Sequence, residues 1–398
     1  MTQDAIQVHD GYDIYGAEFA KDPHAVWKAM RSGGCPVAHS ALGGGSWTVT
    51  KYNDIRDIAQ DPERYSSRAI EVAGPVPAVG RELFMPPLTS GPEEHKAHRD
   101  LLMPYFTPDK IALLEPFVRA EARRLAQAIA ERGHGDAVDD FATPLALAVI
   151  TKILKVPADA RDRFVDWVVR LIRLGPHDQA VRSAVIQEKL QYLEKLLDER
   201  TLNPGDDLIS YLGHATLDGQ PLPRRHKLGS LFLLVLAGAD TTWSAIGASL
   251  WHLASHPNDR ATLVADPGLM RTTAVEELLR AYAPVSIARL TTEEVELHGR
   301  CIAAQQRVIL PLAAANRDPE VFEDPDTVKL DRKRNRHLTF SSGPHRCLGS
   351  NVARLELRVA LEEWLSAMPH FHLTEPDAVA WSTGQTRGPE HVKIGVGQ

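Results

Sequence analysis

The stretch Phe340-Ser341-Ser342-Gly343-Pro344-His345-Arg346-Cys347-Leu348-Gly349 decides the fold, and a helix is expected directly after it, over residues 350–367. A cysteine at the mouth of a helix meets free backbone N–H groups and the positive end of the helix dipole. Both stabilise a thiolate. The glycines at 343 and 349 allow the backbone to fold tightly around the sulfur. Such a thiolate can serve as a nucleophile, a redox thiol or a metal ligand.

The surroundings of Cys347 favour metal ligation among these three roles. Nothing nearby resembles a catalytic Cys–His–Asn pattern, and no second cysteine follows at a resolving distance. A single thiolate that ligates a metal suits a haem, whose other iron ligands are porphyrin nitrogens. The alternative is a buried structural cysteine in a loop.

A second polar signal lies in a long expected helix from about residue 225 to 255, between Pro223 and Pro257. The helix is apolar on nearly every face, so we expect it to run buried through the centre of the molecule. Its middle reads Ala237-Gly238-Ala239-Asp240-Thr241-Thr242. An acid and two hydroxyls in an apolar helix are costly without a role. A glycine followed by small polar residues can open the helix, so that a threonine bonds a carbonyl or water; a kinked helix with satisfied polar groups is the alternative.

Both motifs are similar to those of one family. FSSGPHRCLG resembles the haem-binding signature FxxGxHxCxG of cytochrome P450, and AGADTT is similar to that family's AGxDTT segment. The resemblance implies that Cys347 is the axial ligand of the haem iron. It also implies that Asp240 and Thr241 deliver protons during dioxygen activation. Further cofactor contacts are expected from Ala237, Phe340 and Gly349.

Glu277 and Arg280 stand three residues apart, so they share a helix face. Taken alone, such a pair is usually an exposed pair of little consequence. In the family an ExxR pair joins a later arginine to hold the loop before the haem cysteine, and Arg332 stands in the matching place. We assign these three residues to structure.

Four dispersed cations form the next group. His95 and Arg99 lie four apart on one expected helix face, Arg289 follows a Pro-Val-Ser-Ile-Ala segment, and His345 precedes the cysteine by two residues. Haem carries two propionates, whose burial requires hydrogen-bonded cations. Each position resembles a propionate contact of the family, although each alone would read as a surface cation. The family usually has Asp before the proline of the HxxxR segment; Gly91 stands there instead, which leaves the local loop contact in doubt.

The resemblance runs from Asp22-Pro23 to the final strand region and predicts a mainly α fold with small β-sheets. This is the cytochrome P450 fold, as a single catalytic domain over 1–398, with the haem between the central helix and the helix after the cysteine loop. The sequence pattern itself predicts helices over 22–32, 52–60, 109–132, 140–155, 158–174, 178–200, 259–265 and 269–282. It predicts strands over 46–50, short strands over 285–312, and an irregular loop over 70–90.

Composition narrows the class of protein. The chain has 398 residues and a net charge of -7, which argues against general nucleic-acid binding. Its three cysteines, Cys35, Cys301 and Cys347, form neither a disulfide framework nor CxxC zinc spacing. The N-terminus lacks the features of a signal peptide, and the longest apolar stretch is too short to cross a bilayer. We therefore expect a soluble cytoplasmic protein without nucleic-acid or membrane partners.

The function implied by the resemblance is that of a haem-thiolate monooxygenase using haem b and O₂. Its expected reaction is hydroxylation or oxidative dealkylation of a hydrophobic substrate. The stretch after Cys347 is too short for a reductase domain. We therefore expect electrons from NAD(P)H through a separate ferredoxin reductase and ferredoxin. A set of four cations near the haem loop favours an acidic ferredoxin, or is simply a solvated loop: Lys333, Arg334, Arg336 and Arg346.

The substrate pocket is expected to involve the 70–90 loop, the central helix, the strand after Pro284 and a turn near Gln385. Mostly apolar lining suggests a small or medium hydrophobic substrate, although apolar side chains are also what any core contains. A peroxide-driven haem enzyme is a rival reading, against which the Asp240–Thr241 pair argues. A haem-thiolate sensor or carrier is another, but no output domain is visible. The residues expected to line the pocket are Phe84, Leu236, Val285, Ile287 and Thr386.

Overall fold

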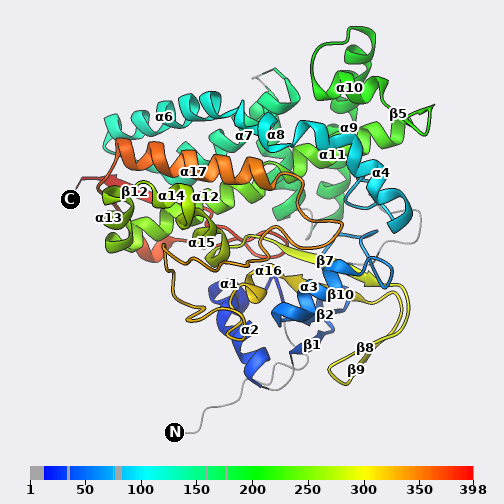
Figure 1. Cartoon of the computed structure of the whole chain (residues 1–398), viewed down its shortest axis with the longest axis horizontal. Helices are drawn as coiled ribbons and strands as arrows, with labels where there is room; N and C mark the ends of the chain where they lie inside the picture. Colours follow the sequence, from blue (N-terminus) through cyan, green and yellow to red (C-terminus); the bar gives the residue numbers. More distant parts are fainter. Residues whose placement is uncertain are drawn as a thin grey trace.

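The computed structural model describes residues 13–33, 36–74, 76, 83–157, 160–174 and 178–397. Helices fill one side of the molecule and the larger sheet lies on the other, with α2 and α3 beside it (Figure 1). This arrangement agrees with the expected mainly α fold with small β-sheets.

The central helix is confirmed, but it is interrupted. It consists of α11 (Arg224–Ala237) and α12 (Asp240–Ser255), with a turn at Gly238 and Ala239 between them. By length and composition Arg224–Ser255 could span a bilayer, yet 78% of its most apolar part is buried inside the molecule. The apolar faces are therefore explained by protein packing on all sides.

Three helices pack around this centre. α17 (Ser350–Ala367) lies against both α6 (Glu115–Arg132) and α12, and α7 (Thr143–Leu154) packs on α12 and α6 (Figure 1). The helix expected over 109–132 is in fact two helices, because α5 (Pro108–Ala112) ends in a turn before α6 begins. Pro116 in the first turn of α6 explains this new start, since proline is favoured at the beginning of a helix.

The other helices follow the expected order. The expected helix over 158–174 consists of α8 (Arg161–Val169) and a π-helical turn, Arg170–Leu174. Residues 158 and 159 lie outside the described residues. A further π-helical turn, Ala137–Ala142, leads into α7. The remaining helices are α1 (Ala17–Lys21), α2 (Pro23–Ser32), α3 (Tyr52–Gln60), α4 (Pro92–Leu102), α8 (Arg161–Val169), α9 (Gln179–Leu202), α10 (Leu208–His214), α13 (Pro257–Ala265), α14 (Leu269–Thr272), α15 (Ala274–Ala281) and α16 (Leu312–Ala315).

The largest sheet has five strands in the order β1-β2-β10-β7-β3. Its β10–β7 hairpin is antiparallel, with Ile309 opposite Ala288, whereas β10 runs parallel to β2. The strands are β1 (Val37–Ser40), β2 (Ser46–Val49), β3 (Tyr65–Ser66), β7 (Ser286–Thr291) and β10 (Arg307–Pro311). Two small hairpins pair β5 (Thr216–Leu217) with β6 (Gln220–Pro221) and β8 (Val295–Leu297) with β9 (Arg300–Ile302).

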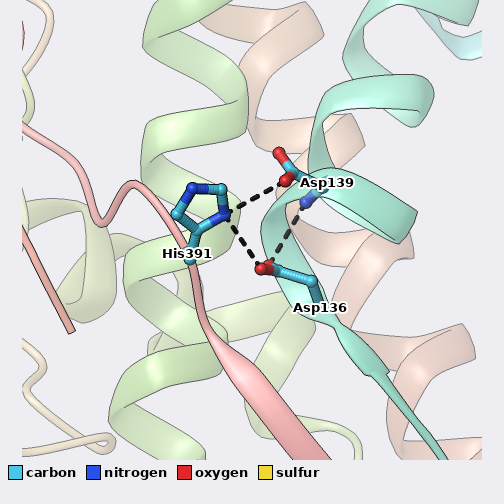
Figure 2. Close-up of side chains that lie close together, drawn as sticks. All are labelled: Asp136, Asp139 and His391. Carbon is cyan, nitrogen blue, oxygen red and sulfur yellow. Dashed lines mark hydrogen bonds and ion pairs between the residues drawn. The ribbon is translucent and has the colours of Figure 1, made fainter. Parts of the chain in front are cut away.

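The C-terminal tail is tied back to the start of the π-helical turn before α7. β12 (Lys393–Val396) pairs with β11 (Phe371–Leu373) and β4 (His134–Asp136). Just before β12, His391 Nδ1 lies 3.1 Å from a carboxylate oxygen of Asp136 and 3.0 Å from one of Asp139 (Figure 2). Asp136 also accepts hydrogen bonds from the backbone of Val138 and Val392, so this cluster fastens the tail to the helical layer.

Buried apolar residues form two clusters. The larger one fills the space between α6, α7, α11, α12 and α17, and the smaller one lies between α2, α3 and the five-stranded sheet.

Candidate functional site

A cavity of about 380 Å³ lies between the central helix and the cysteine loop. Leu236, Ala237 and Thr241 line it from the junction of α11 and α12, and Cys347 lines it from the cysteine loop. Ile287 lines it from β7, and Val285 lines it from the position just before β7. Thr386 forms a β-bridge with Val285. Tyr15 lines it too, so the cavity brings together segments separated by more than half the chain.

The cysteine loop is closed by backbone contacts. Cys347 N donates to Phe340 O at 2.9 Å, and Arg346 N donates to Gly343 O at 3.1 Å. Gly343 has a φ of +72° and passes so close to α3 that a Cβ would lie 2.6 Å from Ala59 O. α17 begins at Ser350 with Gly349 as its N-cap. Cys347 thus lies at a helix mouth, as the sequence predicts.

The Cys347 side chain is exposed to the cavity, and protein surrounds the cavity around it. Burial raises the pKa of its thiol; the backbone N–H of Gly349 and the positive charges of Arg99, Arg346 and Arg354 act in the opposite direction. The helix mouth alone does not outweigh desolvation here. A metal ion at the sulfur would, because a coordinating thiol is deprotonated outright.

Four cationic side chains gather at one part of this cavity: His95, Arg99, Arg289 and His345. The rings of His95 and His345 lie 4.2 Å apart, and Arg289 is 3% exposed. Burial lowers the pKa of His345 to about 3, and the charges of Arg289, His95 and Arg99 add to this effect. Burial also lowers the pKa of Arg289 to about 10.

Among the described residues, none of these four side chains forms an ion pair with a carboxylate; Asp100 acts on His95 and Arg99 only through its charge. Nε2 of His95 and Nδ1 of His345 are buried and have no hydrogen-bond partner in the part of the chain that the structure describes. The Arg289 guanidinium donates to the carbonyl oxygen of the adjacent Ala288. Buried polar groups are normally satisfied, so two unpartnered ring nitrogens beside two arginines are suited to an anionic ligand.

The interruption of the central helix exposes a hydroxyl to the cavity. Thr241 Oγ1 donates to Ala237 O at 3.0 Å, across the turn at Gly238 and Ala239. The same threonine lines the cavity, while its neighbour Asp240 is buried at 3% exposure and lies outside the lining. The sequence predicts this threonine-to-carbonyl bond, and the structure places it at the opened position of the helix.

Glu277 holds the segment that precedes the cysteine loop. Its carboxylate accepts hydrogen bonds from Nε and Nη2 of Arg280 at 2.8 Å each and from Nε of Arg332 at 2.9 Å. It also accepts from the backbone N of Lys329 at 2.8 Å and from Asn335 Nδ2 at 3.1 Å. Glu277 and Arg280 are completely buried, so the predicted three-residue arrangement is present and lies inside the protein.

One expected pocket residue lies elsewhere. Phe84 does not line the cavity; its ring packs edge-on against His98 and His226, with the guanidinium of Arg225 4.7 Å from the ring centre. Its neighbour Leu83 and the following Pro87 and Leu88 line the cavity instead. Sequence cannot decide this, because irregular backbone has no periodicity that fixes where a side chain points. Much of the expected 70–90 loop, residues 75 and 77–82, lies outside the described residues.

The structure adds polar lining residues that the sequence does not single out. Glu356 of α17 is 1% exposed, and burial raises its pKa well above the usual value. Tyr15, Glu71 and Arg182 line the cavity from three other segments. Glu356 follows Cys347 by nine positions on an expected helix, but no local pattern marks the other three.

The four basic residues expected near the cysteine loop do not all belong to one depression. Lys333, Arg334 and Arg336 line a second pocket with Val321 and Phe322, whereas Arg346 lines the cavity at Cys347 and is also exposed.

Comparisons with known proteins agree with one another. A cytochrome P450 family model matches residues 270–379. "Probable cytochrome P450 127A1" of Sinorhizobium fredii is 32% identical over 93% of this chain and 89% of its own length. "Vitamin D(3) 25-hydroxylase" of Pseudonocardia autotrophica is 33% identical over 91% of this chain and 90% of its own. The solved structure of the Bacillus subtilis cytochrome P450 PksS has a TM-score of 0.88 and 29% identity, covering 97% of this chain and all of that chain.

Proposed function

The chain belongs to the cytochrome P450 family, and from this premise we propose that it is a monooxygenase that inserts one oxygen atom of O₂ into a small to medium hydrophobic organic substrate. The expected outcome is hydroxylation or oxidative dealkylation. One observation carries the proposal: Cys347, the four basic side chains His95, Arg99, Arg289 and His345, and Thr241 all line the same cavity. We further propose that residues 1–398 act as one catalytic domain.

The residues fit a haem, which the family implies, and we propose haem b. Its two propionates would be held by His95, Arg99, Arg289 and His345. Nε2 of His95 and Nδ1 of His345, buried and without a partner in the described residues, could donate hydrogen bonds to them. Cys347 would hold the haem iron through its sulfur. Phe340, Gly349 and Ala237 line the same space and would pack against the ring. When bound, haem supplies the redox-active iron that activates dioxygen.

The protein's own contribution is proton supply and positioning. Thr241 Oγ1 points its hydrogen bond to Ala237 O and lies on the cavity wall, where it can hold a water or pass a proton. Asp240, the adjacent buried carboxylic acid, would then return a proton to that hydroxyl. Leu236, Val285, Ile287 and Thr386 would orient the substrate by contact.

We propose NAD(P)H, a ferredoxin reductase and an acidic ferredoxin as the electron source, and the cytoplasm as the location. Arg346 is exposed beside Cys347, and Lys333, Arg334 and Arg336 lie on the segment that leads to the cysteine loop. Opposite charge on the partner would speed the encounter. Electron transfer should then slow as salt rises, because screening weakens such steering.

The identity of the iron ligand is tested by Cys347→His, with Cys301→Ser as the control, since Cys301 is exposed in β9. The wild type and the control, each loaded with haem and reduced under carbon monoxide, should give the absorption typical of thiolate ligation. The Cys347→His protein should lose it. If the signature survives in that variant, another residue is the ligand and the proposal is wrong.

A further inference from the structure

A second group of polar side chains lines the cavity, apart from the cations around Cys347. Arg182, in the first turns of α9, donates a hydrogen bond from Nη2 to Glu71 Oε1 at 2.6 Å. The two residues lie 111 positions apart in the sequence. Their side chains are only 22% and 20% exposed. Tyr15, from the N-terminal segment, lines the cavity with them.

The two groups of charges are distinct. Burial raises the pKa of Tyr15 to about 12, and the nearby charges that modify it are Arg182, Arg307, Asp13 and Glu71. Within the described residues, no hydrogen bond or ion pair joins the Glu71–Arg182 pair to His95, Arg99, Arg289 or His345.

The backbone around Glu71 is firmly placed. Arg307, which is 1% exposed, donates to the carbonyl oxygens of Gly43 and Gly45 at 3.4 Å each and of Gly74 at 2.8 Å. Gly74 N donates in turn to Gly43 O. A segment held in this way presents the Glu71 carboxylate at a defined position, which is what a recognition site needs.

Ile70 and Val72, the sequence neighbours of Glu71, also line the cavity, as does Leu171. Within the described residues the Arg182 guanidinium donates to Glu71 alone, which leaves further N–H groups for another acceptor. Because Glu71 already balances its charge, a neutral oxygen can accept from Arg182 without repulsion, whereas a carboxylate would face Glu71.

We propose that Arg182, balanced by Glu71, is a specificity-determining residue that binds a neutral oxygen acceptor, such as a ketone or ester carbonyl, at one end of an otherwise apolar substrate. The inference rests on the proposed monooxygenase function and narrows its substrate class from hydrophobic molecules in general to amphipathic ones with a neutral polar end.

The test uses three ligands with the same number of carbons: an n-alkane, a methyl ketone and a fatty carboxylate. Dissociation constants are measured by calorimetry on the haem-loaded protein. The wild type should bind the ketone about three- to tenfold more tightly than the alkane, the range for one hydrogen bond. Arg182→Met should remove that advantage and leave alkane binding unchanged. Glu71→Gln should free the charge of Arg182 and strengthen carboxylate binding about tenfold.

The matched control is Arg170→Met. Arg170 pairs at 2.9 Å with Glu188, which lies on α9, the helix that carries Arg182. Arg170 does not line the cavity, so its loss should alter none of the three affinities. An unchanged ketone preference in Arg182→Met would overturn the inference, as would equal weakening of all three ligands, because a purely structural tie acts on every ligand alike. Failure of the proposed function is distinguishable: the wild type would then lack the thiolate signature with carbon monoxide.

Discussion

Gly343 has a φ of +72°, and a Cβ on it would meet Ala59 O at 2.6 Å and the Cα of Gln60 at 2.8 Å. Two demands therefore fall on one residue of the cysteine loop: a left-handed backbone and a close approach to α3. Gly349 has neither demand, because its φ is -83° and nothing lies within 4 Å of a Cβ built on it. The two glycines of the motif thus serve different purposes.

Gly343→Ala should reduce the free energy of unfolding by about 2–5 kcal/mol, the sum of left-handed strain and overpacking. Gly299→Ala is the control, since Gly299 has the same φ of +72° with open space around it. It should cost only about 1–2 kcal/mol. Denaturant titration of both variants measures the difference. Equal losses would mean that the contact with α3 contributes nothing.

Thr241→Ala should uncouple NAD(P)H consumption from product formation, because the hydroxyl that bonds Ala237 O on the cavity wall is gone. We expect the product formed per NAD(P)H to fall about tenfold or more, with peroxide released. Thr241→Ser keeps the hydroxyl and should restore most of the coupling. Tight coupling in the alanine variant would refute the proton-delivery role.

At the scale of elements, the break between α11 and α12 is set by packing as much as by glycine. A Cβ on Gly238 would lie 2.9 Å from Ile150 Cδ1 of α7 and 3.1 Å from Leu234 O. The neighbouring helix thus requires a glycine at the point where the central helix turns. The turn brings Thr241 Oγ1 within hydrogen-bonding distance of Ala237 O.

The tie between α15 and the segment before the cysteine loop is also a property of elements. Glu277→Gln should reduce the free energy of unfolding by about 3–5 kcal/mol, because Arg280 and Arg332 would keep buried charges without a carboxylate. Asp198→Asn, which breaks the exposed pair with Arg224, should cost about 0–1 kcal/mol. Denaturant unfolding measures both changes. Comparable losses would show that burial of the network adds nothing.

At the scale of the whole molecule, carboxylates tie α17 to other parts of the fold. Glu115 of α6 pairs with Arg358, and Glu276 of α15 pairs with Arg354. Hydrogen bonds from Arg358 and Arg119 lower the pKa of Glu115 to about 2. Burial acts to raise the pKa of Glu276, but hydrogen bonds from His337 and Arg354 outweigh it and lower the pKa to about 2.

These depressed pKa values predict the acid response. A carboxylate whose folded pKa lies below its unfolded value contributes stability above the unfolded value, 4.5, and loses it as pH falls toward 2. The free energy of unfolding should therefore decline across that window. Glu276→Gln should flatten the decline, since that position no longer takes up a proton. An identical pH profile in the variant would show that Glu276 is not one of the groups responsible.

The sequence by itself determined what depends on local spacing and on contiguous motifs. The loop around Cys347, the opened helix at Gly238–Thr241 and the Glu277–Arg280 pair each lie within a few residues, where helix periodicity and backbone geometry set their form. The central helix was recognisable because its apolar residues cover nearly every face. About these features the structure agrees with the prediction closely.

Only the tertiary structure decided the features that depend on distant segments meeting. The Glu71–Arg182 pair joins residues 111 apart, and no local pattern marks either one. Phe84 turned toward His98 and His226, away from the expected pocket, because the neighbours available to a side chain in irregular backbone are set by packing. Cys347 was identifiable from its loop. The other residues that line its cavity, from Tyr15 to Thr386, come together only when the whole chain folds.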